Sequence, residues 1–499
     1  MKKKIKFAVL LAGVILASSS LLMVNNKPKI DAKIYGKAVT KIAGNKNYPI
    51  YHRVSKKGPS GKFTSTSYFK HGQIQSKKYV STKKGNFWDI YVDGRHLGWV
   101  NQNFFARNQI SVAKSVDLVR NSDYSFNTHD AINYATNSQG TAVHVNKVQV
   151  SKKYVSTKSS TVDYKYGKAK AQVKIDVHEM PDAINNADTK KGFRTVKAWN
   201  GGSKSSSRNW NAAHHYRSET RGNTFKTKGL KVRTRLFQPR FVSLDSSYRQ
   251  DVMGPVGRTP EGITVKDNIF AVSMFSNTNK PYGHLVSYNL NHIKSKTAAQ
   301  NLTSMRWSTF KSYAKNIKVS PYIKLGHGQS LGSSNSYIYV MANDNKYRNG
   351  SKSEEILQIR KSDMKINKIW TFKIDYNNRY IHNATFTDDN TMYALFHNGG
   401  YNKYEYWRLD LKDNVWQPTQ VGATSGSFVK GSPVQGFTYG NGNFYIAFND
   451  NIFKVAKNGT AKKHYGFKVR REIEGLSFNK SKLYCEFAQR SELTSGVPR

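Results

Sequence analysis

Cysteine is almost absent from this chain: Cys485 is the only one among 499 residues. A single cysteine excludes an intrachain disulfide and every zinc site built on several thiolates. The sequence also has no His-x-x-x-His pair and no Asp-rich calcium loop, so the identity of any bound metal stays unknown. Cys485 lies in the strand-like run Leu-Tyr-Cys-Glu-Phe, where we expect a packed apolar side chain and not a nucleophile.

Acidic residues are also scarce. Lys and Arg total 80 against 31 Asp and Glu, which gives a formal net charge of +49. Hydrophobic residues make up 38% of the chain and tyrosine occurs 30 times, more than a disordered polycation would carry. The composition therefore predicts basic folded domains that attract polyanions, such as teichoic acids, acidic glycans, anionic lipid or nucleic acid.

The N-terminus has the pattern of a secretory signal. Met1–Lys6 is basic, Phe7–Ala17 is apolar, and small residues follow it. We expect residues 1–26 to be a cleaved signal peptide, with an uncleaved N-terminal anchor as the alternative because Leu21–Val24 extends the apolar stretch. Export without disulfides is typical of a Gram-positive bacterium. It predicts a secreted protein of the cell wall or cell surface, with no specific nucleic acid partner and no membrane contact beyond this segment or anionic surface attraction.

Residues 36–108 alternate short strand-like phrases with Gly and Asn turns. Asn86–Val92 is expected to pair, across an Asp93-Gly94 turn, with a strand that carries Gly98-Trp99. This stretch resembles the GW domain, an SH3-like barrel of Gram-positive surface proteins. The resemblance implies attachment to lipoteichoic acid, teichoic acid or related wall polymers and glycans. We assign three aromatic residues to this wall-binding module: Trp88, Tyr91 and Trp99. Packing in the barrel core is the alternative for both tryptophans.

Residues 111–180 have strand-like alternation, including a strict period of two over Ala169–Val177, with one short helix expected at Thr128–Ala135. This module resembles the bacterial immunoglobulin-like (Ig-like) spacers of surface proteins. Residues 181–230 are rich in Ser, Asn and Lys and contain tryptophan, so they are expected to be a linker that partly packs on the following domain.

A short phrase recurs five times in the C-terminal half, each time followed by a polar turn and an aromatic or β-branched strand. One copy about every 40–50 residues is typical of one β-propeller blade per copy. The copies are Pro260–Val265, Gly328–Gly332, Ile381–Phe386, Val434–Tyr439 and Ile473–Phe478. We predict a five-bladed propeller over residues 231–490, whose fifth unit lacks a third strand of its own and is completed by a strand around Leu236–Leu244. The whole chain is then all-β: an SH3-like barrel, an Ig-like sandwich and a C-terminal propeller.

The propeller half also resembles a known family. Tyr282–Ile293, together with Gln435-Gly436-Phe437 and Ile446, is similar to helveticin-J-type proteins, the large class III bacteriocins of lactic acid bacteria. The resemblance implies the propeller fold and an action on the envelopes of related bacteria. It carries over no catalytic residue.

Alignment of the five phrases places one polar side chain from each blade at the same position. The innermost strand of a blade lines the central channel, so these side chains are expected to form a ring: Glu261, Gln329, His382, Gln435 and Glu474, with His327 at the mouth. The ring is a candidate binding site, in which a cation is one conceivable ligand. The alternative is that Glu and Gln bond the neighbouring blade and only hold the ring closed.

Three functions remain open from the sequence. The first is a secreted, strongly cationic protein that binds the cell envelope through teichoic-acid-type polymers and displays a ligand-recognising propeller. The second is a helveticin-J-type bacteriocin that kills related bacteria. The third is an enzyme active on wall glycans, with Glu261 and Glu474 as acid and base. We predict no catalytic residues, because the sequence favours a binding protein over an enzyme.

Overall fold

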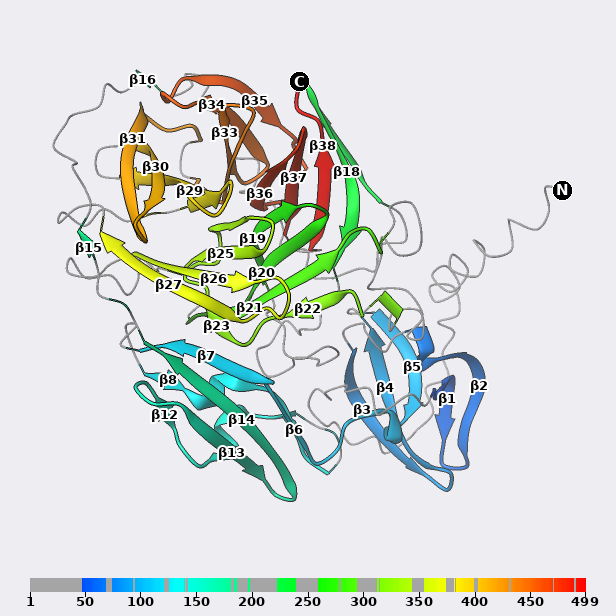
Figure 1. Ribbon diagram of the computed structural model, residues 1–499. Helices are drawn as coiled ribbons and strands as arrows, with labels where there is room; N and C mark the ends of the chain where they lie inside the picture. The colour runs from blue at the N-terminus through cyan, green and yellow to red at the C-terminus, as the bar shows by residue number, and fades with distance from the viewer. Residues whose placement is uncertain are drawn as a thin grey trace, which may run out of the picture.

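The structure is a computed structural model, and Figure 1 shows its three β-rich parts. It describes residues 47–68, 74–92, 95–120, 125–138, 140, 142–179, 181, 184–185, 196–197, 222–238, 259–277, 280–293, 312–313, 315–342, 354–373, 381, 383–398, 403–429, 432–469, 471–488 and 491–499. The predicted signal peptide, most of the predicted linker and His382 lie outside these ranges. The named elements of the described residues are strands and short 3-10 helices, which confirms the all-β class. No helix in these ranges is long and apolar enough to cross a membrane.

The N-terminal part is a five-stranded antiparallel barrel with the strand order β2-β1-β5-β4-β3. Its strands alternate inward apolar and outward polar residues, and the inward set includes Ile50, Trp88, Ile90 and Val100. The predicted Asp93-Gly94 turn lies outside the described residues, but the two strands that it would join do pair. The strands are β1 (Pro49–Ser55), β2 (Gly58–Ser65), β3 (Ile74–Thr82), β4 (Gly85–Val92) and β5 (Arg95–Asn101).

The second part is a sandwich of small sheets around one apolar core. Its largest sheet has the order β11-β13-β14-β7, in which β14 runs parallel to β7, and the others are β10-β9-β6 and β12-β8. The strands are β6 (Gln109–Val112), β7 (Ser115–Val119), β8 (Phe126–Asn127), β9 (Ile132–Thr136), β10 (Ala142–Val143), β11 (Gln149–Val150), β12 (Tyr154–Val155), β13 (Ser160–Tyr166) and β14 (Ala169–His178).

The helix predicted at Thr128–Ala135 is wrong. Only one 3-10 turn forms, η3 (Thr128–Ala131), capped by the Asn127 side chain, and the chain then extends into β9. Every residue of β9 is buried, because this strand lies between β6 and β10 inside the sandwich. A helix of this length would have turned some of these residues to solvent.

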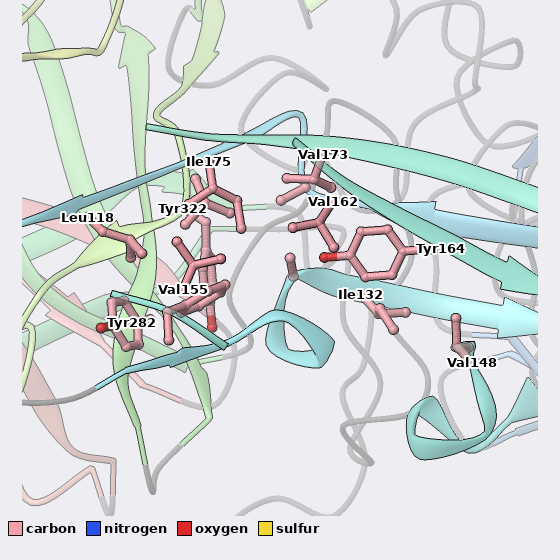
Figure 2. Packing of buried hydrophobic residues seen from close by; sticks show 14 of the residues in the cluster. Leu118, Ile132, Val148, Val155, Val162, Tyr164, Val173, Ile175, Tyr282 and Tyr322 are labelled. Atoms are coloured by element: carbon pink, nitrogen blue, oxygen red, sulfur yellow. The ribbon is translucent and has the colours of Figure 1, made fainter. Parts of the chain in front are cut away.

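The second module is packed against the propeller, as Figure 2 shows for the residues of their shared apolar cluster. Phe126 makes T-shaped, edge-to-face contacts with Tyr282 and Tyr322 of the propeller, with ring centroids 5.2 Å and 6.0 Å apart. Backbone bonds join the two parts as well: the Tyr322 amide donates to Ser115 and its carbonyl accepts from Asp117, each over 3.0 Å. The module therefore does not act as a free spacer toward the propeller.

The C-terminal half forms five antiparallel blades, as predicted, which we number along the chain by their innermost strands. These innermost strands touch in the cyclic order β19, β24, β28, β32, β36 and back to β19, so the ring is closed.

Blade 1 contains β19 (Thr259–Lys266), β20 (Ile269–Asn277), β21 (Lys280–Asn289), β22 (Ile317–Val319) and β23 (Ile323–Lys324). Blade 2 contains β24 (Leu331–Ser333), β25 (Tyr337–Met341), β26 (Glu354–Arg360) and β27 (Ile366–Lys373). Blade 3 contains β28 (Asn383–Phe386), β29 (Thr391–Asn398), β30 (Lys403–Lys412) and β31 (Val415–Ser425). Blade 4 contains β32 (Gly436–Gly440), β33 (Asn443–Phe448), β34 (Asn451–Ala456) and β35 (Ala461–Gly466).

Blade 5 joins strands from both ends of the propeller. It contains β36 (Ile473–Asn479), β37 (Lys482–Phe487) and β38 (Glu492–Gly496), and β18 (Leu230–Phe237) pairs antiparallel with β38 (Figure 1). The predicted closing strand therefore begins earlier in the chain, and residues 239–244 lie outside the described ranges. The expectation that the fifth unit lacks a third strand of its own is wrong, because β38 fills that place.

Short strands from the predicted linker extend the outer edges of three blades. β15 (Ile184–Asn185) and β16 (Val196–Lys197) run parallel to β27 and β31, and β17 (Thr224–Thr227) pairs with β18. These additions give blades 2, 3 and 5 a fifth strand and cover edges that would otherwise be open to pairing.

Hydroxyl groups of the repeated phrase join neighbouring blades. The Phe478 amide donates to Thr438 Oγ1 over 3.1 Å, and the Val265 amide donates to Ser477 Oγ over 2.8 Å. Thr438 and Ser477 occupy the same position of the phrase. The hydroxyl at this position therefore bonds the backbone of the adjacent blade.

Candidate functional site

The innermost strands bring the predicted polar residues to the propeller axis. Glu261 lies in β19 and Glu474 in β36, while Gln435 directly precedes β32 and Gln329 lies two residues before β24. Glycine follows or precedes these residues because the neighbouring backbone is close: a Cβ on Gly262 would lie 2.5 Å from the Gly328 carbonyl oxygen. Four side chains of the predicted ring thus come from four different blades.

These side chains form one hydrogen-bonded cluster, which we call the channel cluster: Glu261, Gln329, Gln435, Glu472 and Glu474. Gln329 Nε2 donates to Gln435 Oε1 over 2.6 Å, and Gln435 Nε2 in turn donates to Glu472 Oε1. Glu474 bonds both Glu472 and Glu261 through its carboxyl group. Of the two remaining predicted residues, His382 lies outside the described residues and His327 is exposed.

Glu472 is a member that the sequence reasoning missed. It lies one residue before the phrase Ile473–Phe478, so an alignment of phrases does not include it. The available signal was its spacing of two residues from Glu474, because side chains at i and i+2 of an extended chain point to the same side.

Burial of Glu261 and Glu474 close to other carboxyl groups changes their protonation. Burial, and then the charge of Glu472, raises the pKa of Glu261 from 4.5 to about 8, although hydrogen bonds from Gln329 and Glu474 act in the other direction. The pKa of Glu474 is also raised well above its ordinary value, first by burial and then by the charges of Glu261 and Glu472. At neutral pH the cluster therefore holds protons, and it presents amide and carboxyl groups that can both donate and accept.

The cluster does not have the geometry of a metal centre. Within the ranges that the structure describes, no group of three or more His, Cys, Asp or Glu side chains could hold a metal ion. Protons held by Glu261 and Glu474 already reduce the repulsion that a cation would otherwise relieve.

One pentapeptide of the propeller matches the Gly-x-Ser-x-Gly pattern of a hydrolase nucleophile, namely Gly328–Gly332. Its serine is not placed as a nucleophile. Ser330 is buried, its Oγ accepts the Ala384 amide over 3.0 Å, and the strand β24 follows it in place of a helix. Cys485 is likewise buried, and burial raises the pKa of its thiol, so it is the packed residue that its strand position predicted.

The barrel places its three predicted contact residues differently. Trp88 is fully buried and makes T-shaped, edge-to-face contacts with Tyr79 and Phe105, with ring centroids 5.1 Å and 5.6 Å away. Trp88 is therefore a core residue of the barrel, and its assignment as a polymer contact is wrong. Tyr91 and Trp99 are half-buried and keep part of their rings at the surface.

The backbone geometry explains why glycine precedes tryptophan in the Gly98-Trp99 pair. Gly98 has a φ of +145°, and a Cβ there would lie 2.6 Å from the Tyr51 carbonyl oxygen. The register of β4 and β5 shifts beside this position, which turns Trp99 toward Val54, Val80 and Phe87. Glycine thus allows the close approach of β1, and tryptophan covers a second, smaller apolar cluster of the barrel.

Comparison with known families supports the barrel assignment. Residues 33–106 match the GW (Gly-Tryp) dipeptide domain. This part of the chain therefore carries a module typical of cell-wall-associated surface proteins. No curated protein matches the chain, and the helveticin-J resemblance receives no support from these comparisons.

Solved structures similar to this chain are propeller-like but distant. A catalytically inactive virginiamycin B lyase from Staphylococcus aureus is 11% identical over 70% of this chain and 94% of that chain, with a TM-score of 0.27. The Swd1 β-propeller domain of Myceliophteria thermophila is 7% identical over 49% and 99%, with a TM-score of 0.26. The exo-beta-1,3-galactanase of Phanerochaete chrysosporium is 10% identical over 56% and 64%, with a TM-score of 0.33. Scores this low give no argument about ligand or activity.

Proposed function

We propose that this protein is a secreted, strongly cationic cell-envelope-binding protein of a Gram-positive bacterium. The barrel holds it on teichoic-acid-type polymers, and the propeller recognises a second ligand at the channel cluster. The observation that carries the proposal is the match of residues 33–106 to the GW domain.

The charge of the barrel supports an anionic partner. Within its described residues the acidic side chain is Asp89, which is buried and bonded to His96 over 2.5 Å. Basic side chains are exposed on several strands and turns, among them Arg53, Lys62 and Lys78. Such a surface attracts a polyanion, and salt screens the attraction.

The test uses the full-length protein on purified cell walls, with teichoic polymers either retained or chemically extracted. We expect binding to the intact walls that falls steeply between about 0.05 and 0.2 M salt, and little binding to the extracted walls. Equal binding to both preparations would contradict the proposed anchor.

The channel cluster supports recognition of a hydroxyl-rich ligand such as a wall glycan. Amide and protonated carboxyl groups at one level of the channel offer donors and acceptors without the repulsion of several full charges. Titration of glycan fragments into wild-type protein should give binding that Gln435→Ala removes. The exposed Gln172→Ala change is the matched control, and an equal loss in both variants would argue against the channel site.

The geometry does not favour the glycan enzyme. Retaining and inverting glycosidases separate their two carboxyl groups by about 5 Å or more, whereas Glu261 and Glu474 are bonded directly to one another. Hydrolysis of wall glycan at an undiminished rate by a Glu261→Gln, Glu474→Gln double variant would confirm that these residues are not its acid and base.

Killing of related bacteria is a second proposal, supported by the helveticin-J-type segment Tyr282–Ile293. In the structure Tyr282 packs against the second module, and His284 is buried with its Nδ1 2.9 Å from the Ser320 carbonyl oxygen. These residues serve the fold, so the proposal depends on the resemblance alone. Purified protein overlaid on related strains should clear them if it is a bacteriolysin, and intact lawns would reject this function.

A further inference from the structure

Two hairpin turns of the barrel have the same three-residue sequence. β1 and β2 are joined by Lys56-Lys57 before Gly58, and β3 and β4 by Lys83-Lys84 before Gly85. In each turn the glycine takes the positive φ, +135° and +103°. The geometry therefore requires the glycines, and it leaves the residue type at the two preceding positions free.

The two turns lie against one another. The Lys83 amide donates to the Lys56 carbonyl oxygen over 3.2 Å. A Cβ on Gly58 would lie 2.9 Å from Lys84 Cδ, so the Lys84 stem crosses the other turn at its glycine. Hairpin loops that are separated in sequence are thus joined into one surface, which we call the lysine tips: Lys56, Lys57, Lys83 and Lys84.

The backbone of the lysine tips is held in place on both sides. Thr82 Oγ1 donates to the Gly85 carbonyl over 2.8 Å and accepts the Lys84 amide over 3.0 Å. Ser55 Oγ donates to the Gly58 carbonyl over 3.2 Å. The four Cα positions are therefore fixed before any ligand binds, which lowers the entropy lost on binding.

The charge of the tips is not neutralised within the described residues. All four lysines are exposed, and none of them takes part in an ion pair there. Four like charges on adjoining turns repel one another, which destabilises the isolated barrel. An anionic ligand with several charges would remove this repulsion, whereas a single small anion would pair with one ammonium group only.

We propose that the lysine tips are the site at which the barrel binds a polymer of repeating phosphodiesters, with successive phosphates on the two turns. This inference rests on the proposed wall-binding function and names the surface that performs it. It shifts the contact from the aromatic residues expected from the sequence to the hairpin ends.

The test measures the affinity of the full-length protein for deacylated poly(glycerol phosphate) over a series of salt concentrations. The variant replaces all four lysines of the tips: Lys56→Gln, Lys57→Gln, Lys83→Gln and Lys84→Gln. The matched control removes the same charge from exposed lysines of the second module, Lys147→Gln, Lys158→Gln, Lys165→Gln and Lys170→Gln. We expect the tip variant to bind about tenfold more weakly or worse, with a shallower salt dependence, and the control to change by about twofold or less.

Several outcomes would overturn the inference. Equal losses in both variants would mean that net charge and not the tips determines binding. An unchanged tip variant that still binds intact walls would reject the site but leave the proposed function standing. Binding to acylated lipoteichoic acid or anionic lipid vesicles, but not to the deacylated polymer, would show that the ligand is lipid. If the wild-type protein binds neither walls nor polymer, the proposed function falls together with the site.

Discussion

Gln329 donates a hydrogen bond to Gln435 over 2.6 Å, although the two residues belong to blades 2 and 4, which are not neighbours. Blade 3 lies between them in the ring. The bond therefore crosses the channel, and the propeller is bridged by side chains at this level. The channel cluster consequently connects blades that share no strand contact.

The bridge makes a testable contribution to stability. Gln435→Ala removes two hydrogen bonds at once, the one that Gln435 accepts from Gln329 and the one that it donates to Glu472. The partly buried amide of Gln329 and carboxyl group of Glu472 then lose these partners. We expect the free energy of unfolding to fall by about 1–3 kcal/mol. Urea unfolding followed by tryptophan fluorescence measures it. Gln172→Ala, which removes an exposed bond to Asp163, is the control and should cost less than about 0.5 kcal/mol.

The raised pKa of Glu261 predicts a pH dependence with a definite sign. The folded protein holds this proton up to about pH 8, whereas an unfolded chain releases it near 4.5. Between these values the folded state binds more protons, so stability decreases as the pH rises through this window. Glu261→Gln should weaken that decrease. Melting temperatures at several pH values between 5 and 8 measure it, and parallel curves for wild type and variant would refute the assignment.

The closing blade depends on a buried ion pair. Glu492 of β38 is fully buried, pairs with Arg471, and accepts bonds from Asn223 before β18. Glu492→Ala leaves the arginine without its partner and should cost about 3–5 kcal/mol.

The single cysteine reports on this blade directly. Cys485 is buried in β37, beside β38, so a thiol reagent reacts only when the blade opens. Labelling should be much faster in Glu492→Ala than in wild type. Asp363→Ala, which breaks the exposed pair with Arg360, should leave the labelling rate almost unchanged.

The contact between the second module and the propeller should make them unfold together. Phe126→Ala removes a buried ring that contacts both Tyr282 and Tyr322, and we expect a cost of about 3–5 kcal/mol. Calorimetry of this variant should show the module melting before the propeller. The exposed Tyr154→Ala change should preserve the wild-type profile, and a wild type that already melts in separate steps would contradict the coupling.

The repeated phrase predicts five blades because the residues that each blade requires lie close together in the sequence. Each copy needs a small residue where backbones approach, as at Gly262, and a hydroxyl such as Thr438 that bonds the next blade. The channel position was predictable for the same reason, because Glu261 and Glu474 align within the phrase.

Other features have no local signal. β38 is short and polar, and it is a strand only because β18 and β37 flank it. β9 was mistaken for a helix because burial on both faces removes the period of two. Trp88 and Trp99 lie on paired strands of the barrel, yet one is fully buried and the other half-buried. The strand register determines which face each one occupies, because Trp88 pairs with Val100 and Trp99 pairs with Asp89.

The pairing of β18 with β38 also fixes an order of events during synthesis. β17 and β18 leave the ribosome before the other three strands of blade 5, yet β38, which pairs with the second edge of β18, is made after all four other blades. Until then the ring stays open, and an unpaired edge is available to other chains. The propeller therefore closes late in translation or after it. Chaperones that shield the open edge of β18 until β38 is made would raise the yield of correctly folded protein.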